Sequence, residues 1–171
     1  MALNKVRNVI YFAAVMYNPV VVREPEEVTS KLWGEEVLRS ETFDFDHTAY
    51  YTSEMGGALK KYFAAFGEPD SPEHLSAYKL ASVKEEDALR QGESRIINID
   101  PGYLAAEKIV VASTKNFTHR VFIGDGIYGD LQLMRRKDGL TSMPWTYEDY
   151  KRTVVINFFD ELYSLFKAYL D

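Results

Sequence analysis

Cysteine is absent from the sequence, and histidine occurs only at positions 47, 74 and 119. The absence of cysteine excludes disulfide bonds, thiolate catalysis and cysteine-ligated zinc or iron–sulfur sites. The three histidines are too far apart to form a local metal-binding motif. No apolar run reaches the roughly 20 residues that cross a bilayer, and the N-terminal segment has no small-residue cleavage pattern. We therefore expect a soluble, cytoplasmic protein that is not associated with a membrane.

Positive charge is also scarce, because 20 Lys and Arg residues face 26 Asp and Glu residues and leave a net charge of −6. General nucleic-acid binding requires clustered positive charge, and the one basic run is Arg135-Arg136-Lys137. Several enzyme signatures are missing too. There is no G-x-x-x-x-G-K-[ST], no G-x-G-x-x-G that opens a helix after a strand, no G-x-S-x-G and no H-E-x-x-H. These absences disfavour P-loop nucleotide hydrolases, dinucleotide-binding folds and the common hydrolase classes.

Aromatic residues, by contrast, are plentiful. The 171 residues are 46% apolar and include 12 Tyr and 10 Phe. This length suits one domain with one substantial core, so we expect a single globular domain over residues 1–171. Abundant aromatic rings indicate either a thick core or a cleft that binds a flat ligand, and the core is the commoner use.

The first half of the sequence predicts alternating strands and helices. The expected strands cover residues 6–16, 43–55, 59–66 and 95–100, and the expected helices cover residues 24–39 and 71–90. Ser71 and Pro72 provide a cap and a first helical position for the second helix, whose sparse apolar positions suggest a surface location. This order matches a ferredoxin-like, split-βαβ half.

The second half begins ambiguously at Asp100-Pro101-Gly102, which either caps a helix over residues 103–115 or forms a turn before a strand over 108–114. The run Ile109-Val110-Val111 favours the strand. Strands over 119–123 and 127–136 flank the hairpin signal Gly124-Asp125-Gly126. Thr146 then caps a long C-terminal helix. The predicted class is α+β: a largely antiparallel sheet, with a β-meander in the second half and the long terminal helix.

Polar residues concentrate near the start of this meander. If strands 108–114 and 119–123 are neighbours, they bring together Ser113, Lys115, His119 and Arg120, with Asp100 and Tyr103 entering from the preceding strand. His119 could then act as a general acid or base, Arg120 could bind an anionic group, and Asp100 could orient the site. The alternative is that these residues are solvated or stabilise turns.

The expected strand over residues 43–55 places Asp46, Thr48, Tyr50 and Glu54 on one face. Asp46 and Glu54 would lie roughly 26 Å apart, which excludes a close acid/base pair. Asp44 and Asp46, about 7 Å apart, could hold a hard cation such as magnesium. The alternative is a hydrated sheet face, so metal use is left undecided. Trp145 either lines a cleft with Tyr128 or packs as a hydrophobic staple, and packing is favoured.

Five segments, in order, resemble a known family: FDHTAYYTSEMG, NIDPGYL, STKNFTHR, GDGIYGDLQL and PWTYEDY. The sequence resembles, from about residue 7 to its C-terminus, the uncharacterised prokaryotic family called domain of unknown function forty-four sixteen. Some members of that family carry a GTP-binding label, whereas this sequence has neither a phosphate-binding loop nor an N-K-x-D guanine motif.

The resemblance selects positions that overlap with those chosen on chemical grounds. They are Asp46, Thr48, Tyr50, Tyr51, Glu54, Asp100, Pro101, Gly102, Tyr103, Ser113, Lys115, His119, Arg120, Gly126, Ile127, Tyr128, Trp145, Thr146 and Tyr147. One departure is Gly129-Asp130, where the family pattern has a small residue followed by Glu. A shorter carboxylate at Asp130 weakens the case for a role in a site.

Two functional hypotheses follow. The first is the binding of a small anionic ligand, such as a phosphate or nucleotide compound, by Asp46, Tyr50, Glu54, Tyr103, Ser113, Lys115, Arg120 and Tyr128. The second is an enzyme of unrecognised class that uses His119 with Arg120 and a carboxylate such as Asp100. A structural or protein-interaction role is a third option, with an oligomer formed through the aromatic-rich C-terminal helix. The sequence identifies no cofactor.

Overall fold

The computed structural model describes residues 5–46 and 49–169. The first half of the chain contains β1 (Val9–Tyr17), α1 (Pro25–Trp33), β2 (Glu36–Arg39), β3 (Phe43–Asp44), η1 (Ala49–Tyr51), α2 (Thr52–Met55), β4 (Lys60–Asp70), η2 (Pro72–His74), α3 (Leu75–Ala88) and β5 (Ile97–Leu104). The second half contains β6 (Lys108–Ser113), β7 (Arg120–Gly124), β8 (Ile127–Arg136), β9 (Gly139–Ser142), η3 (Glu148–Lys151), α4 (Thr153–Phe166) and η4 (Lys167–Tyr169).

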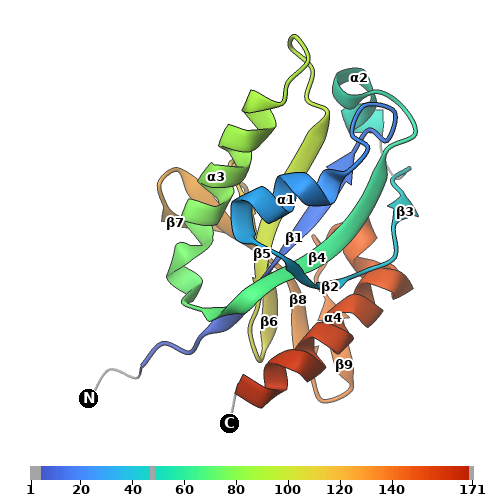
Figure 1. The fold of residues 1–171 in the computed structure, drawn as a ribbon. Coiled ribbons are helices and arrows are strands. Elements are labelled where there is room, and N and C mark those ends of the chain that lie inside the picture. The colour runs from blue at the N-terminus through green and yellow to red at the C-terminus, as the bar shows by residue number, and fades with distance from the viewer. Residues whose placement is uncertain (1–4, 47–48, 170–171) are drawn as a thin grey trace.

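The described strands form one antiparallel sheet in the order β2-β4-β1-β5-β6-β8-β7, with β3 beside β4 and β9 beside β8. Its first four strands, read as β5-β1-β4-β2, have the order of a ferredoxin-like βαββαβ unit. The connecting helices α1 and α3 lie on the same side of this half (Figure 1). The predicted α+β class, the ferredoxin-like half and the long C-terminal helix are therefore confirmed.

Strand β1 is the centre of the sheet and is apolar on both faces. Ile10, Phe12 and Ala14 contact the core beneath α4, whereas Ala13 and Val15 contact the core beneath α1. A strand that is covered on both faces reads as a continuous apolar run instead of an alternation. The run over residues 6–16 therefore predicts this position well.

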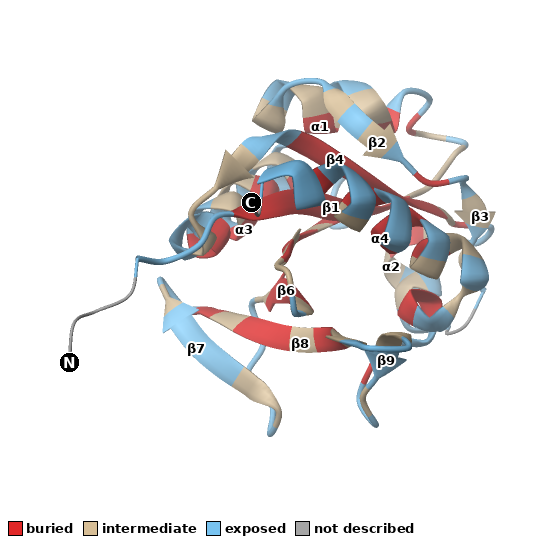
Figure 2. Cartoon of the chain, turned by 90° about the horizontal axis from the view of Figure 1, so that it is seen from below, coloured by how far each residue is buried: buried red, intermediate tan, exposed pale blue. Residues whose placement is uncertain are grey.

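Helix α4 lies inside the curve of the sheet. Figure 2 shows α1 outside β4 and β1, α4 against their opposite face, and β8 on the far side of α4. The α4 side chains Phe159 and Leu162 share one buried cluster with Phe63 of β4 and Leu133 of β8. Arg135 of β8 also stacks on Tyr163, 3.8 Å from the ring centroid. Because the large aromatic residues of α4 face this core, its composition is explained without an oligomer, which stays a prediction.

The expected strand over residues 43–55 is wrong. Pairing between β3 and β4 stops where Asp44 meets Lys60, the first residue of β4, so the chain beyond it has no strand to pair with. It turns instead into η1 and α2. Tyr51 and Met55, four residues apart, then contact a buried cluster with Met16 and Leu59, a spacing that suits one helix face. Thr48 lies outside the described residues.

Three other expectations need correction at element boundaries. The helix expected over residues 24–39 ends at Trp33, since Gly34 adopts a φ of 84°, and the chain then forms β2. Asp100-Pro101-Gly102 is neither a cap nor a turn but the middle of β5. Thr146 does not cap the C-terminal helix. Its hydroxyl donates to the Gln132 carbonyl and accepts from the Met143 amide.

The remaining strand predictions are confirmed. Residues 108–113 form β6, and β7 and β8 form the hairpin around Gly124-Asp125-Gly126, where Asp125 and Gly126 have positive φ. Among the helices of the described part of the chain, none has the length and apolar character needed to span a membrane.

Gly102 is the point of closest approach between β5 and its neighbours. A Cβ atom at this position would lie 2.5 Å from the Phe12 ring and 2.5 Å from the Val110 carbonyl oxygen. The carbonyl belongs to the backbone of β6 and cannot move aside cheaply. We predict that Gly102→Ala lowers the free energy of unfolding by about 1–3 kcal/mol or more, because it overpacks a filled site.

Urea unfolding checks this prediction, with Gly57→Ala as the matched control. Gly57 has open space where a Cβ would lie and no positive φ. Its substitution is expected to leave the midpoint within experimental error or to raise it slightly. Equal effects of the two substitutions would contradict the crowding at Gly102.

Candidate functional site

A cleft of about 800 Å³ opens where β5 and β6 separate. The two strands pair only at residues 102–104 with 109–111. Pro101 has no N–H to continue the ladder, and the preceding residues of β5 diverge from β6. The space between them is bordered by α3, by the η1–α2 segment, by the start of β4, by β6 and by residues 147–150.

The free edge of β5 finds its hydrogen-bond partners on α3. The Lys79 ammonium donates to the Ile99 carbonyl over 3.0 Å, and the Ile99 amide donates to the Glu86 carboxylate over 2.7 Å. Buried backbone groups require such partners when no strand supplies them. The buried face of α3 is consequently polar and includes Ser76, Lys79, Ser82 and Glu86. The helix does expose one face, with Leu80 and Lys84 on it, as expected of a surface helix, but its few apolar residues gave no sign that the opposite, polar face is buried.

These side chains continue into an ionic network along one wall of the cleft. Lys79 also contacts Asp100 over 2.8 Å, and Asn98 donates to the other oxygen of Asp100 over 2.8 Å. Arg95 binds both oxygens of Glu54, over 2.7 and 2.8 Å, and reaches Asn98 over 2.8 Å. The network joins α2, α3 and β5, so it fixes the relative positions of the three elements that form this wall.

Burial and charge act in opposite directions on the pKa values of this network. Burial by itself raises the pKa of Asp100, but the positive charges of Lys79 and Lys61 outweigh it and hold the pKa below its ordinary value. Burial would lower the pKa of Lys79, yet Asp100 and Glu86 raise it. Burial dominates at Glu86, whose pKa is raised despite Lys79. The Lys79–Asp100 pair is therefore ionised at neutral pH.

The opposite wall is organised by Asp130, whose side chain is buried. Its carboxylate accepts from Arg120 over 2.8 Å and from the Gln132 amide over 2.8 Å. Arg120 donates further to the Lys115 carbonyl over 2.9 Å and to the Tyr147 hydroxyl over 2.8 Å. Asp130 thus fixes the position of the Arg120 guanidinium at the cleft wall. Although Asp is shorter than Glu, the carboxylate of Asp130 reaches Arg120.

Lys61 and Tyr150 contribute polar atoms from the buried side of the cleft. The Lys61 ammonium lies 2.5 Å from Asp149, with the Phe45 and Phe63 rings 5.1 and 5.6 Å away. The Tyr150 hydroxyl is buried and has no hydrogen-bond partner among the described residues. An unpaired buried hydroxyl costs free energy, so the Tyr150 hydroxyl destabilises the fold at this position.

Six of the predicted site residues meet at this cleft: Tyr50, Glu54, Asp100, Ser113, Lys115 and Arg120. They meet for a different reason from the one expected. Strands β6 and β7 are not neighbours, because β8 lies between them. The loop after β6 instead folds back so that Lys115 contacts Arg120, and the Lys115 ammonium donates to the Tyr50 hydroxyl over 2.8 Å.

The other predicted residues do not line the cleft. His119 stacks on Trp145, with ring centroids 5.0 Å apart, and its Nε2 lies 3.3 Å from Asp130. Tyr103 contacts Tyr11 on the opposite face of the sheet, and Tyr128 contacts the exposed Phe122.

Asp46 is exposed near Arg152, at 3.9 Å, and its neighbour Asp44 is bound by Lys60. Within residues 5–46 and 49–169, no group of three or more His, Asp or Glu side chains is arranged to hold a metal ion. The postulated magnesium pair therefore gains no third carboxylate or imidazole ligand from the described residues.

Sequence reasoning missed several residues of the cleft, namely Lys61, Lys79, Glu86, Arg95, Asp149 and Tyr150. One signal was available on the helix: Lys79, Ser82 and Glu86 recur at spacings of three and four, which places them on one face. Lys61 and Asp149 are 88 positions apart in the sequence and carry no local pattern that would have paired them.

The fold and the cleft define a class, that of α+β proteins with a ferredoxin-like half whose extended sheet separates to form a tyrosine- and charge-lined cavity. Within that class, the chain belongs to the family described as Domain of unknown function (DUF4416), whose model matches residues 7–166. The comparison with curated proteins and the comparison with solved structures each give no match.

The buried ion pair should be essential to the wall of the cleft. We predict that Lys79→Met lowers the free energy of unfolding by about 3 kcal/mol, since it leaves Asp100 and Glu86 without their shared cation. This loss is at the low end of the range of about 3–5 kcal/mol for breaking a buried ion pair, because the Asp100 side chain is partly exposed at the cleft. The double variant Lys79→Met with Asp100→Leu should cost less than the sum of the single substitutions.

Lys31→Met is the matched control for chemical denaturation. Lys31 also pairs with a carboxylate of α3, Glu85, over 2.6 Å, but 67% of its side chain is exposed. An exposed pair contributes about 0–1 kcal/mol, so this variant should unfold almost as the unchanged protein does. If the two lysine variants lose equal stability, the importance of the buried network is refuted.

Tyr50 should lose its phenolic proton at a lower pH than an ordinary tyrosine. The hydrogen bond from Lys115 and its positive charge lower the pKa of Tyr50 below 10.0, whereas burial raises the pKa of Tyr51 to about 12. An alkaline titration of tyrosinate absorbance, taken as the difference from Tyr50→Phe, isolates this group. Lys115→Ala is expected to shift the Tyr50 transition to higher pH, and no shift would rule out the contact in solution.

Proposed function

We propose that the protein binds a small anionic ligand, with a phosphate or carboxylate group, in the cleft between β5 and β6. The cavity volume of about 800 Å³ falls in the usual range of small-molecule sites, roughly 300–1,000 Å³. Tyr50, Tyr51, Tyr147 and Tyr150 supply aromatic surface along it, which suits a ligand with a flat ring. A nucleotide combines both features.

The observation that carries this proposal is the unequal use of hydrogen-bonding groups around the cavity. Two of its carboxylates are fully engaged within the wall, since both oxygens of Glu54 bind Arg95 and both oxygens of Asp100 bind Lys79 and Asn98. The lining carboxylates Asp87 and Glu148 each have a cation beside them, Arg90 and Lys151. Lys61 and Lys115 each use one of three N–H donors on a described polar partner, so their remaining donors are where an anion would bind.

Arg120 contributes charge and position instead of a free fork. Its guanidinium is held by Asp130, Tyr147 and the Lys115 carbonyl, so it does not need to be ordered when a ligand arrives. A pre-organised cation loses little side-chain entropy on binding. The ammonium groups of Lys61 and Lys115 would make the direct contacts.

Thermal denaturation with a panel of anions tests the proposal. Inorganic phosphate, AMP, GMP, GTP and citrate would be compared with uncharged nucleosides, and any ligand that raises the melting temperature would be titrated by calorimetry. We expect at least one anion to bind, and Lys115→Ala to weaken it by about tenfold, as loss of a charged hydrogen bond does.

Lys137→Ala serves as the control, because it removes the same charge from the exposed turn between β8 and β9. It should leave the affinity unchanged at constant ionic strength. Equal weakening by both variants would show non-specific attraction, and a protein insensitive to every anion would refute the proposed function.

The alternative is an enzyme in which His119 acts as an acid or base. The contact between its Nε2 and Asp130, at 3.3 Å, favours this reading, because a carboxylate can orient an imidazole. His119 reaches the cleft through Arg120 and Asp130 and not by lining it. The alternative would be established if the protein converts a bound anion to a product, and if His119→Gln abolishes this conversion but still binds the anion.

A further inference from the structure

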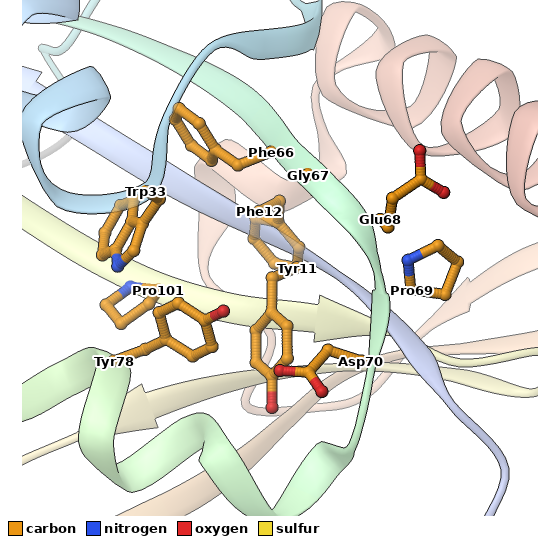
Figure 3. Close-up of a pocket in the computed structure, with 10 residues that line it drawn as sticks. All are labelled: Tyr11, Phe12, Trp33, Phe66, Gly67, Glu68, Pro69, Asp70, Tyr78 and Pro101. Atoms are coloured by element: carbon orange, nitrogen blue, oxygen red, sulfur yellow. The ribbon is translucent and has the colours of Figure 1, made fainter.

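A second cavity, of about 260 Å³, lies on the α1 and α3 side of the sheet, away from the cleft. Figure 3 shows the residues around it, which come from β1, α1, β4, α3 and β5. Five aromatic residues line it, namely Tyr11, Phe12, Trp33, Phe66 and Tyr78. The sequence offers no signal for this cavity, since these residues belong to different elements that are separated in the chain.

A bulge in β4 creates the cavity. Tyr11 pairs with Phe66, but Val9 pairs with Asp70, so residues 67–69 leave the regular ladder. Gly67 makes this possible with a φ of 64°. The strand bends away from β1 at this point, as bulged strands do. Asp70 is thereby brought beside Tyr11, and the bulge forms one rim of the cavity.

The rings border the cavity in several orientations. Trp33 lies 5.8 Å from Tyr78 at an angle of 65° and 5.3 Å from Phe66 at 61°. Tyr11 and Tyr78 are 4.3 Å apart at 39°. Rings tilted against one another offer both faces and edges to a guest, and the faces carry the negative part of the ring quadrupole. The aromatic boundary is therefore electron-rich.

The charged residues that line the cavity are both acidic, and one of them, Asp70, contacts the neighbouring His74 over 2.7 Å. Glu68 and Asp70 line it, and none of the lining residues is Lys or Arg. In Figure 3 the Asp70 carboxylate lies beside the Tyr11 ring, whereas the Glu68 carboxylate points away from the rings. After burial, the negative charge of Asp70 is among the causes that raise the pKa values of Tyr11 and Tyr78. The electric field of the Asp70 carboxylate therefore acts on the phenol groups of both Tyr11 and Tyr78.

Asp70 is also held in place. Its carboxylate accepts from the Ser71 amide over 2.7 Å and contacts His74 Nδ1 over 2.7 Å. The Tyr11 hydroxyl donates to the Ser71 carbonyl over 2.6 Å, which fixes the ring beside it. These contacts order the carboxylate and the ring before any ligand binds, and pre-organisation of this kind reduces the entropic cost of binding.

We propose that this cavity binds a small organic cation of the quaternary or methylated ammonium type. Aromatic faces attract such cations through their quadrupoles, most strongly at Trp, and the Asp70 carboxylate supplies the opposite charge. The volume lies just below the roughly 300 Å³ at which drug-sized pockets begin, so it suits a single ammonium head group. The site does not depend on the anion proposed for the cleft.

Fluorescence of Trp33 provides the test. The chain has two Trp residues, so Trp145→Phe leaves Trp33 as the reporter. Choline would be titrated at neutral pH and at successively higher pH, beside its uncharged carbon isostere 3,3-dimethylbutan-1-ol, because Asp70 raises the pKa of His74 and a protonated His74 competes for the carboxylate. We expect saturable quenching by choline and at least tenfold weaker binding of the isostere. Tyr78→Leu, which removes a ring face but keeps apolar volume, should weaken choline about fivefold.

Asp70→Asn should weaken choline by about tenfold, because it removes the charge and keeps an acceptor for the Ser71 amide. Glu73→Gln is the control, since it removes an equal charge from an exposed neighbour that does not line the cavity. Circular dichroism verifies that each variant is folded. Equal binding of choline and its isostere, equal effects of Asp70→Asn and Glu73→Gln, or absence of saturable quenching would each overturn the proposal.

Discussion

The hydrogen-bonding requirement of one unpaired strand edge governs the organisation of this protein. Where β5 leaves β6, the backbone of Ile99 has no strand on the side away from β1, and Lys79 and Glu86 of α3 take the place of the missing strand. Charged side chains in that position need counter-charges, which Asp100, Arg95 and Glu54 provide. The cleft and its polar wall are thus two results of the same separation, and neither would be expected without the other.

The sheet carries two cavities of different character on its two faces. The cleft faces α2 and residues 147–150, and Lys61 and Lys115 keep N–H donors beyond those used on their described polar partners. The cavity of Figure 3 faces α1 and α3 and is bordered by aromatic rings and carboxylates. Helix α3 contributes to both, through Lys79 and Glu86 on one side and Tyr78 on the other. Because β1 is apolar on both faces, it separates the two cavities with a layer that carries no charge.

Much of the fold can be predicted from local patterns in the sequence, and the failures share a cause. The apolar run of β1, the hairpin at Asp125 and the periodicity of α4 are local signals, and each element forms, although α4 begins at Thr153 and not directly after Thr146. The strand expected over residues 43–55 fails because β4 begins only at Lys60, opposite Asp44, which no local pattern reveals. In the cleft, Lys115 and Arg120 were identifiable by type, but Lys61 and Asp149 meet only through tertiary structure. Polar side chains on the buried face of α3 contradict the rule that buried faces are apolar, and such exceptions are expected at sites.

The position of β1 has a consequence for the order in which the molecule can assemble. The strand made first lies between β4 and β5, so it stays without a partner until residue 60 and then residue 97 have been synthesised. Contacts between such distant segments form slowly, and an apolar strand that has not yet paired is prone to aggregation. The cleft closes later still, since Tyr147 and Tyr150 precede only the last helices. A chain of about two thirds of the length would hold a completed ferredoxin-like half and all the residues of the aromatic cavity, whereas the cleft would still lack Arg120 and residues 147–150.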